Sequence, residues 1–540
     1  MKNFVRGRLA AKLASGVAIA LLSGLLGSQA FAKTLVYCSE SSPEGFDPAL
    51  YSANSTWDAS SRTVYNRLVE FENGTTNVVP GLAESWTVSG DGLEYTFKLR
   101  PGVKFQTTDF FTPSREMNAD DVIFSFERQW KKDSPWYEYS AGTSWEMFDG
   151  MEMPSLIKDI VKVDDHTVKL VLNQPSASIL ASLAMDFGSI MSKEYADKLA
   201  ADGTKEKLNQ QPLGTGPFRF VDYQPDAVIR YQANPDYWAG KPKIDDLIFA
   251  ITIDATARIQ RLQAGECQVA AYPAPADIAG LKADPNLTVM EQPGLNVAYL
   301  AYNTLMPPFD KPEVRKALNM AMNKTAIIDA IFQGTGQVAK NPLPPAMWGY
   351  NDAVEDDKYD PEAARKMLDE AGVKDLKMKI WAMPVSRPYM PNAHRTAELI
   401  QADFAKVGVD AEIVSYEWGE YVKRARDKDR DGALILGGTS DNGDPDNLIS
   451  YFFSCAGVGG ANFANWCYQP VEELIQKART TSDQAERAKI YEQMQVLIKE
   501  QAPWATLDHS TVVLPMSKNV TGYVMDPLGS HRFENVDIAE

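Results

Sequence analysis

Three aspartates, Asp441, Asp444 and Asp446, stand close together in a segment rich in turn-forming residues, 439–447. The segment directly follows an apolar run at 433–436, which is typical of a buried strand. A strand that ends in an acidic loop places carboxylates at the edge of a sheet, where ligands often bind. The pattern therefore predicts that this loop takes part in a binding site.

Arg387 is a candidate partner for such a loop, because it is the one charged residue between positions 380 and 392. Its planar guanidinium can pair with a carboxylate through two hydrogen bonds, whereas an aspartate accepts from an ammonium group. One cationic and one anionic anchor are what a small zwitterion would need, provided that the fold brings them together.

Patterns for catalysis, metals or phosphate are weak. The histidines are few and scattered, no serine lies in a nucleophile elbow, and no glycine-rich loop precedes Lys-Ser or Lys-Thr. Residues 427–432 match the opening of a calcium loop, but the twelfth position, which requires glutamate, is Gly438. We expect no catalytic residue, no metal and no cofactor, with an exported peptidase as a weaker alternative. The histidines are His166, His394, His509 and His531.

Two further patterns are best explained by local structure. The pair Asp120 and Asp121 precedes an apolar helical pattern at 122–126, which predicts helix capping. The proline in the glycine-rich segment 214–218 disfavours a helix start, so we expect a tight turn into a strand at 219–223.

The amino terminus has the organisation of a secretory signal peptide, residues 1–32. A basic stretch without acids is followed by an apolar run at 13–27 and by a small-x-small cleavage site, Ala30 to Ala32. No later stretch is long and apolar enough to cross a bilayer. The net charge is −18, and cleavage would remove four positive charges. Such acidity argues against nucleic acid and against anionic membranes as partners.

Four cysteines remain, and an even number in an exported chain favours disulfides. Cys455 and Cys467 are the natural local pair, which leaves Cys38 for Cys267. Four buried free thiols are the alternative.

Periodicity indicates an α/β protein. Alternating patterns predict strands at 34–38, 93–99 and 167–172. One helix is expected at 313–332, a second from the Asp360 cap to Gly372, and a third at 394–407. Strands at 376–382 and 411–414 alternate with these helices, which implies a parallel-rich sheet. Hinges between two halves are expected near 294–300 and 508–511.

Several segments resemble signatures of the peptide- and nickel-type solute-binding proteins of ATP-driven importers, family 5. They occur in the order of that family, and the resemblance covers essentially all of residues 33–540. The main segments are 82–86 with 93–100 and 102–105, 118–125 and 214–218; others are 33–38, 42–46, 348–352, 381–385 and 416–421.

The resemblance implies a two-lobed periplasmic binding protein of the large cluster C type, with an inserted subdomain and a two-strand hinge. Lobe I would comprise 33–292 and 511–540, with the subdomain at about 66–205, and lobe II would comprise 293–510. It also implies a periplasmic monomer that does not insert into the membrane and that delivers dipeptides to an inner-membrane ABC permease complex. The same two disulfides, Cys38–Cys267 and Cys455–Cys467, are implied.

By the same resemblance, Arg387 would hold the carboxylate of the ligand and Asp441 its ammonium group. Trp418 is expected either in the cleft or in the core. The remaining expected pocket residues are Ser52 from lobe I and Pro388, Tyr389, Gly438, Thr439 and Ser440 from lobe II.

The chain departs from the dipeptide-binding members of the family at two positions. These members carry tryptophan where this chain has Gly438, and glycine where it has Ser440. The missing indole would reshape a side-chain pocket, so tripeptides remain open as ligands. Nickel chelates, haem and opine-like compounds remain open as other cargo on the same scaffold.

Overall fold

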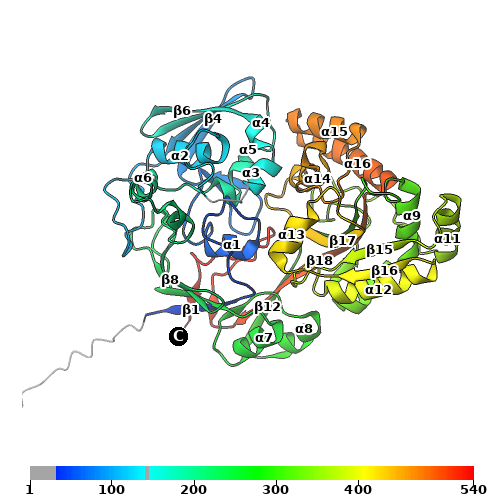
Figure 1. Ribbon diagram of the computed structural model, residues 1–540. Helices are drawn as coiled ribbons and strands as arrows, with labels where there is room; N and C mark the ends of the chain where they lie inside the picture. Colours follow the sequence, from blue (N-terminus) through cyan, green and yellow to red (C-terminus); the bar gives the residue numbers. More distant parts are fainter. Residues whose placement is uncertain (1–31, 140–144, 540) are drawn as a thin grey trace, which may run out of the picture. The chain divides into compact units, whose positions relative to one another are not determined.

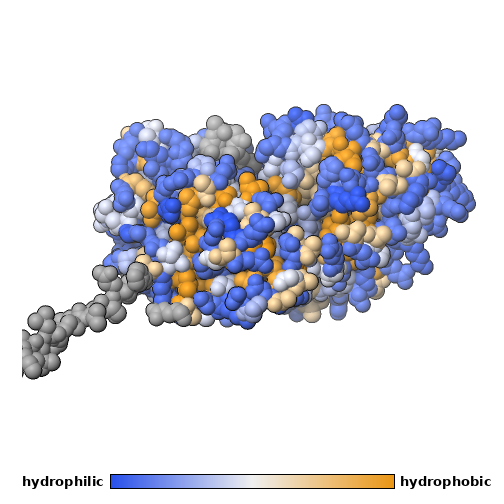
Figure 2. Space-filling model, turned by 90° about the horizontal axis from the view of Figure 1, so that it is seen from below, coloured by the Kyte–Doolittle hydropathy of each residue, from blue (hydrophilic) through white to orange (hydrophobic). Residues whose placement is uncertain are grey.

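The computed structural model describes residues 32–139 and 145–539. The expected signal peptide therefore lies outside the described residues except for Ala32. Residues 33–540 form one compact unit. No helix among the described residues is long and apolar enough to span a membrane. In a view from below, the outer parts of the surface are mainly hydrophilic, and apolar residues show mostly towards the middle (Figure 2).

Most strands belong to one sheet that runs through the unit (Figure 1). Two more strands of this sheet, β12 (Leu287–Pro293) and β14 (Gly336–Val338), pair with β18 (Trp504–Ser517) but lie outside the main strand order. The order along the sheet is β16 (Asp410–Val414), β15 (Lys377–Trp381), β17 (Ala433–Thr439), β13 (Asn296–Tyr302), β18 (Trp504–Ser517), β11 (Val269–Ala270), β1 (Thr34–Ser39), β10 (Asp246–Ile251), β9 (Val228–Ala233) and β8 (Phe218–Gln224).

Strand β18 is shared by the two halves of this sheet. Its first part, from Trp504 to Asp508, pairs with β13, and its second part, from Thr511 to Ser517, pairs with β12. Between them, Asn296 Oδ1 accepts hydrogen bonds from the backbone N of Ser510 (2.9 Å) and from its Oγ (3.2 Å). The two segments expected as hinges therefore lie side by side, and the two-strand hinge is present.

Gly294 is required at this crossing. Its backbone N donates to the carbonyl oxygen of Ser510 (2.9 Å), and a Cβ at this position would lie 2.7 Å from that oxygen. No real Cβ approaches a backbone oxygen so closely, so a larger residue would force the two crossing strands apart.

A separate four-stranded sheet lies within the region expected as the inserted subdomain. Its order is β4 (Ala83–Val88), β5 (Glu94–Leu99), β7 (Thr167–Leu172) and β6 (Ile157–Asp164). Helix α2 (Ala119–Trp130) packs against β6 and β7. At its start, the Asn118 side chain accepts from the N of Asp120, and Asp121 accepts from the N of Asn118. This reciprocal cap confirms the structural explanation of the aspartate pair.

The remaining helices and strands before residue 290 are short. They are α1 (Asn54–Ala59), β2 (Val69–Phe71), β3 (Val78–Pro80), α3 (Glu146–Gly150), α4 (Met153–Leu156), α5 (Ile179–Leu183), α6 (Lys193–Ala201), α7 (Ala255–Gln263) and α8 (Ile278–Ala283), with β19 (Val520–Thr521) and β20 (Asp537–Ile538) near the end.

Helices and strands alternate beyond residue 300, as expected. Strand β15 is parallel to both β16 and β17. Asp360 caps α11 by accepting from the N of Ala363 (2.9 Å). The helices are α9 (Pro312–Ala321), α10 (Lys324–Phe332), α11 (Pro361–Glu370), α12 (Ala393–Lys406), α13 (Trp418–Ala425), α14 (Pro445–Phe453), α15 (Gln469–Thr480) and α16 (Gln484–Gln501).

The expectation of one helix over 313–332 is wrong, because the chain breaks between α9 and α10. Met322 is extended, and Asn323 caps the second helix through its side chain, which accepts from the N of Ala326 (3.1 Å). The N of Asn323 donates to Asp403 on α12 (2.8 Å). A side chain that competes for backbone donors, together with a tertiary partner, overrides the continuous apolar period.

Both expected disulfides are formed in the structure. Cys38 on β1 is joined to Cys267, with 5.8 Å between the Cα atoms, and Cys455 to Cys467, with 4.6 Å. The first bond ties the opening strand to the loop before β11. The second closes the loop after α14.

We expect Asn296→Ala to lower the free energy of unfolding by about 1–3 kcal/mol, because the buried Ser510 donors lose their acceptor. Urea unfolding followed by tryptophan fluorescence measures this. Asn519→Ala, at an exposed turn, is the control and should change stability by less than about 0.5 kcal/mol. Equal stability of the two variants would show that the crossing does not depend on this side chain.

Candidate functional site

A cavity of about 390 Å³ lies at the end of β17. Its volume is within the range of pockets that enclose small ligands. Of the eight residues expected at the site, seven line it, and Ser440 does not. Those seven are Ser52, Arg387, Pro388, Tyr389, Gly438, Thr439 and Asp441.

Arg387 follows β15 in a tight loop, where its backbone pairs with that of Met390. Its side chain is 14% exposed and lies 3.9 Å from Glu40 Oε1. That ion pair is too long to be a hydrogen bond, so the guanidinium retains donors for a ligand. Its centre also lies 5.6 Å from the ring of Trp418. Trp418, whose place the sequence left open, thus lines the cavity.

Asp441 lies in the loop between β17 and α14, and its backbone N donates to Asn447 Oδ1 (2.7 Å). The pKa of its carboxyl is raised from 3.8 to about 7, mainly by burial and also by the negative charges of Asp186 and Glu146. Arg62 and a hydrogen bond with Asn447 act in the opposite direction. In the ligand-free protein, the positive charge near Asp441 is therefore too small to compensate its carboxylate.

Tyr389 lies within electrostatic reach of both Arg387 and Asp441. Burial raises the pKa of its hydroxyl, Arg387 lowers it, and Asp441 raises it. Both anchors therefore act on the same buried ring. The ring packs against β17 so closely that a side chain at Gly437 would collide with it.

The other two aspartates of the acidic segment hold its shape. Asp444 caps α14 and forms two hydrogen bonds of 2.8 Å with Arg487. Asp446 binds Arg479 Nε (3.1 Å). Because arginines of the helices behind the loop pair with these two charges, Asp441 is the aspartate of this segment that lines the cavity.

Ser440 is buried behind the loop rather than exposed to the cavity. Its Oγ donates to Asn447 Oδ1 (3.2 Å) and accepts from the N of Gly443 (3.0 Å). The residue after the strand turns inward because these loop donors and acceptors need partners. Its effect on a ligand is therefore indirect, through the position of Asp441.

Four cavity residues that the sequence analysis missed form a second polar cluster with Ser52. Glu146 of α3 accepts from Ser52 Oγ (3.0 Å) and from Tyr451 Oη (3.4 Å), and it forms an ion pair with Arg426. Glu44 lines the same cavity. Arg426 stands in a charge-rich segment and Glu146 has no motif around it, so nothing in the local sequence distinguishes either residue.

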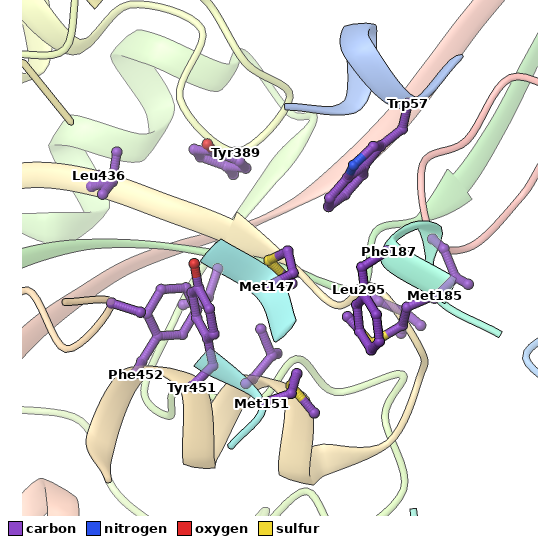
Figure 3. Close-up of a cluster of buried hydrophobic side chains, with 14 of the residues drawn as sticks. Trp57, Met147, Met151, Met185, Phe187, Leu295, Tyr389, Leu436, Tyr451 and Phe452 are labelled. Atoms are coloured by element: carbon purple, nitrogen blue, oxygen red, sulfur yellow. The ribbon is translucent and has the colours of Figure 1, made fainter. Parts of the chain in front are cut away.

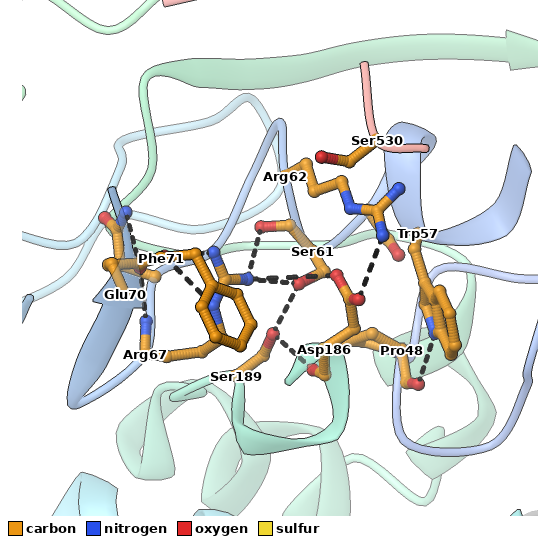
Figure 4. A network of polar contacts seen from close by, with 12 residues as sticks. Pro48, Trp57, Ser61, Arg62, Arg67, Glu70, Phe71, Asp186, Ser189 and Ser530 are labelled. Carbon is orange, nitrogen blue, oxygen red and sulfur yellow. Dashed lines mark hydrogen bonds and ion pairs between the residues drawn. The ribbon is translucent and has the colours of Figure 1, made fainter. Parts of the chain in front are cut away.

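A network of ion pairs around Arg62 and Asp186 acts electrostatically on Asp441 (Figure 4). Arg62 binds Asp58 (2.8 Å) and Asp186 (3.2 Å). Burial raises the pKa of Asp58 to about 6, while Arg62 lowers it. The guanidinium of Arg62 is thus committed to two carboxylates, which explains why it only partly compensates Asp441.

Part of the cavity wall is apolar. Phe452 and Tyr451 rise from α14 towards β17, and Met147 and Leu436 lie near them (Figure 3). Among the described residues, no group of three or more His, Cys, Asp or Glu side chains could hold a metal ion. The arrangement can bind a ligand with charged ends and an apolar part.

The fold and cavity define a solute-binding protein, and comparison with known proteins identifies the family. Residues 77–460 match the model for bacterial extracellular solute-binding proteins, family 5. The chain belongs to this family.

Similar proteins cover nearly the whole chain. The dipeptide-binding protein of Escherichia coli K12 is 55% identical over 522 residues, which is 96% of this chain and 97% of that protein. The di/tripeptide-binding protein 1 of Pseudomonas aeruginosa UCBPP-PA14 is 49% identical and covers 96% and 98%. Among solved structures, the dipeptide-binding protein of Pseudoalteromonas sp. SM9913 in complex with Met-Leu is 38% identical. Its TM-score is 0.90, and the match covers 94% of this chain and 100% of that chain.

We expect Asp441→Asn to stabilise the ligand-free protein at pH 8 and to have little effect at pH 4. The folded-state pKa of about 7 lies above the usual 3.8, so the charged carboxylate destabilises the folded state as pH rises through 7. With a discount for partial exposure, the gain at pH 8 is about 1–3 kcal/mol. Urea unfolding at several pH values measures it. A variant that is less stable than wild type at pH 8 would contradict the assignment.

Proposed function

We propose that this chain captures dipeptides in the periplasm and delivers them to the inner-membrane permease complex of an ABC importer. The observation that carries the proposal is the placement of Arg387 and Asp441 on one cavity beside Tyr389. Membership of a solute-binding family and similarity to proteins named for di- and tripeptides support it.

The two anchors match the two ends of a peptide. Arg387 binds the terminal carboxylate through its fork of donors, and Asp441 accepts from the terminal ammonium group. The span between them limits peptide length. Backbone groups at the end of β17 are free to bind the peptide bond, as in strand addition, and such contacts do not depend on side chains. Tripeptides are the second ligand class, in line with the similarity to a di/tripeptide-binding protein.

Capture rests on closure of two lobes about the crossing of β12, β13 and β18. Lobe I comprises 33–292 and 511–540, with a subdomain at about 66–205, and lobe II comprises 293–510. The protein acts as a monomer after removal of residues 1–32, and it binds its ligand without catalysis.

We expect calorimetry on refolded, ligand-free protein to detect binding of Ala-Ala. Arg387→Ala and Asp441→Ala should each weaken it by about 2–5 kcal/mol, because each leaves a buried charge of the ligand unpaired. The exposed Arg395→Ala and Asp410→Ala are matched controls and should bind as wild type does.

Blocking one peptide end tests the anchors from the ligand side. N-acetylated and C-amidated Ala-Ala should each bind at least about a hundredfold more weakly than the free dipeptide. If a blocked dipeptide binds as tightly as the free one, the two-anchor proposal is wrong. Mass spectrometry of the recovered peptide checks for hydrolysis, and hydrolysis lost with a cavity mutation would favour a peptidase.

Binding should strengthen as pH rises from 5 to 7.5. Asp441 must be charged to pair with an ammonium group, and its pKa in the free protein is about 7. Affinity for Ala-Ala should therefore fall about tenfold for each pH unit below 7, while the peptide ammonium stays charged. The groups that act on this carboxyl are Asp186, Glu146, Arg62 and Asn447. Calorimetry at pH 5, 6, 7 and 7.5 measures the trend, and a constant affinity would contradict it.

A further inference from the structure

The phenylalanine ring at position 452 leaves no room for a side chain at position 438. A Cβ placed on Gly438 would lie 2.8 Å from Cζ of Phe452 and 3.0 Å from its Cε2. Distances below 3.0 Å do not occur for real Cβ atoms, so any residue other than glycine at 438 requires the ring to move. The ring of Phe452 therefore occupies the space that a side chain on this part of β17 would need.

The ring can move aside only by disturbing the aromatic side chains packed around it. It packs edge to face against Tyr299 (5.7 Å between centroids), Trp504 (5.3 Å) and Tyr451 (4.9 Å). Tyr299 and Trp504 are themselves stacked, with 3.5 Å between their centroids. Phe452 is 5% exposed, and it lines the cavity. Its cavity-facing edge is thus fixed by a rigid aromatic cluster that reaches β13 and β18.

We propose that Phe452 determines which ligand side chains this protein prefers, and that its ring can take this position because Gly438 has no side chain. This inference rests on the proposed function and names the ligand class: peptides with one bulky apolar or aromatic side chain. The anchors bind the charged ends of any peptide. Phe452 offers the side chain a rigid aromatic face, with Tyr451, Met147 and Leu436 around it (Figure 3). Such contacts favour an aromatic or long aliphatic group over a methyl group.

Phe453 provides a matched control for this proposal. It is the next residue on α14, is equally buried and packs on Trp504 (4.4 Å) and Trp466 (6.0 Å). Among the described residues that line the cavity, Phe453 is not found. Phe453→Leu and Phe452→Leu should therefore have similar effects on stability, but only the second should alter ligand preference.

The test is calorimetry on refolded wild type, Phe452→Leu and Phe453→Leu with Ala-Ala, Ala-Phe and Phe-Ala. Wild type should bind the better of the two phenylalanine peptides at least about tenfold more tightly than Ala-Ala. This ratio should fall to about threefold or less in Phe452→Leu and stay near the wild-type value in Phe453→Leu. Equal ratios in the two variants would overturn the proposal.

Gly438→Ala gives an independent arm that does not remove the ring. Its methyl group should weaken Ala-Phe or Phe-Ala binding by about tenfold or more, because it displaces the aromatic face. In the double variant Gly438→Ala with Phe452→Leu, the leucine should make room for the methyl group. Its affinity for Ala-Ala should therefore lie within about threefold of that of Phe452→Leu alone. Wild-type ratios in Gly438→Ala would also overturn the proposal. Failure of wild type to bind Ala-Ala or either phenylalanine peptide would instead contradict the proposed function itself.

Discussion

The rest of the structure depends on one strand that belongs to two halves of a sheet. The backbone of β18 must pair with β13 in its first part and with β12 in its second, and the change of partner falls at Ser510. Asn296 and Gly294 meet the chain at this point. A crossing that keeps its hydrogen bonds on both sides lets two halves stay attached while the backbone between them bends.

The cavity beside this crossing combines charges that do not compensate each other in the ligand-free state. The negative charges of Asp186 and Glu146 act on Asp441, and Arg62, which opposes them, already binds two carboxylates. Arg387 has a carboxylate only at 3.9 Å. Such sites sacrifice stability for binding, because a ligand that brings the missing charge of each sign relieves both.

Close packing turns the end of β17 into a site with little freedom to change. Tyr389 requires Gly437, and Phe452 requires Gly438, so the strand has no side chains between its apolar part and Thr439. In the proposed function, the backbone of this segment binds the main chain of the peptide, and the fixed rings around it bind the side chains. The same aromatic cluster reaches β18, which places the side-chain wall directly on the crossing strand.

Local patterns in the sequence determined much of this protein: strands such as β5 and β7, the caps of α2 and α11, the alternation that forms the parallel strands, and the candidate residues Arg387 and Asp441, both of which line the cavity. These follow from short-range periodicity, capping chemistry and a resemblance carried by contiguous segments. The break between α9 and α10, the burial of Ser440 and the cluster of Glu146, Arg426 and Tyr451 were decided only by the tertiary structure. Each depends on partners far along the chain, such as Asp403 for Asn323, and hydrogen bonds and ion pairs between distant residues leave no spacing in the sequence from which they can be inferred.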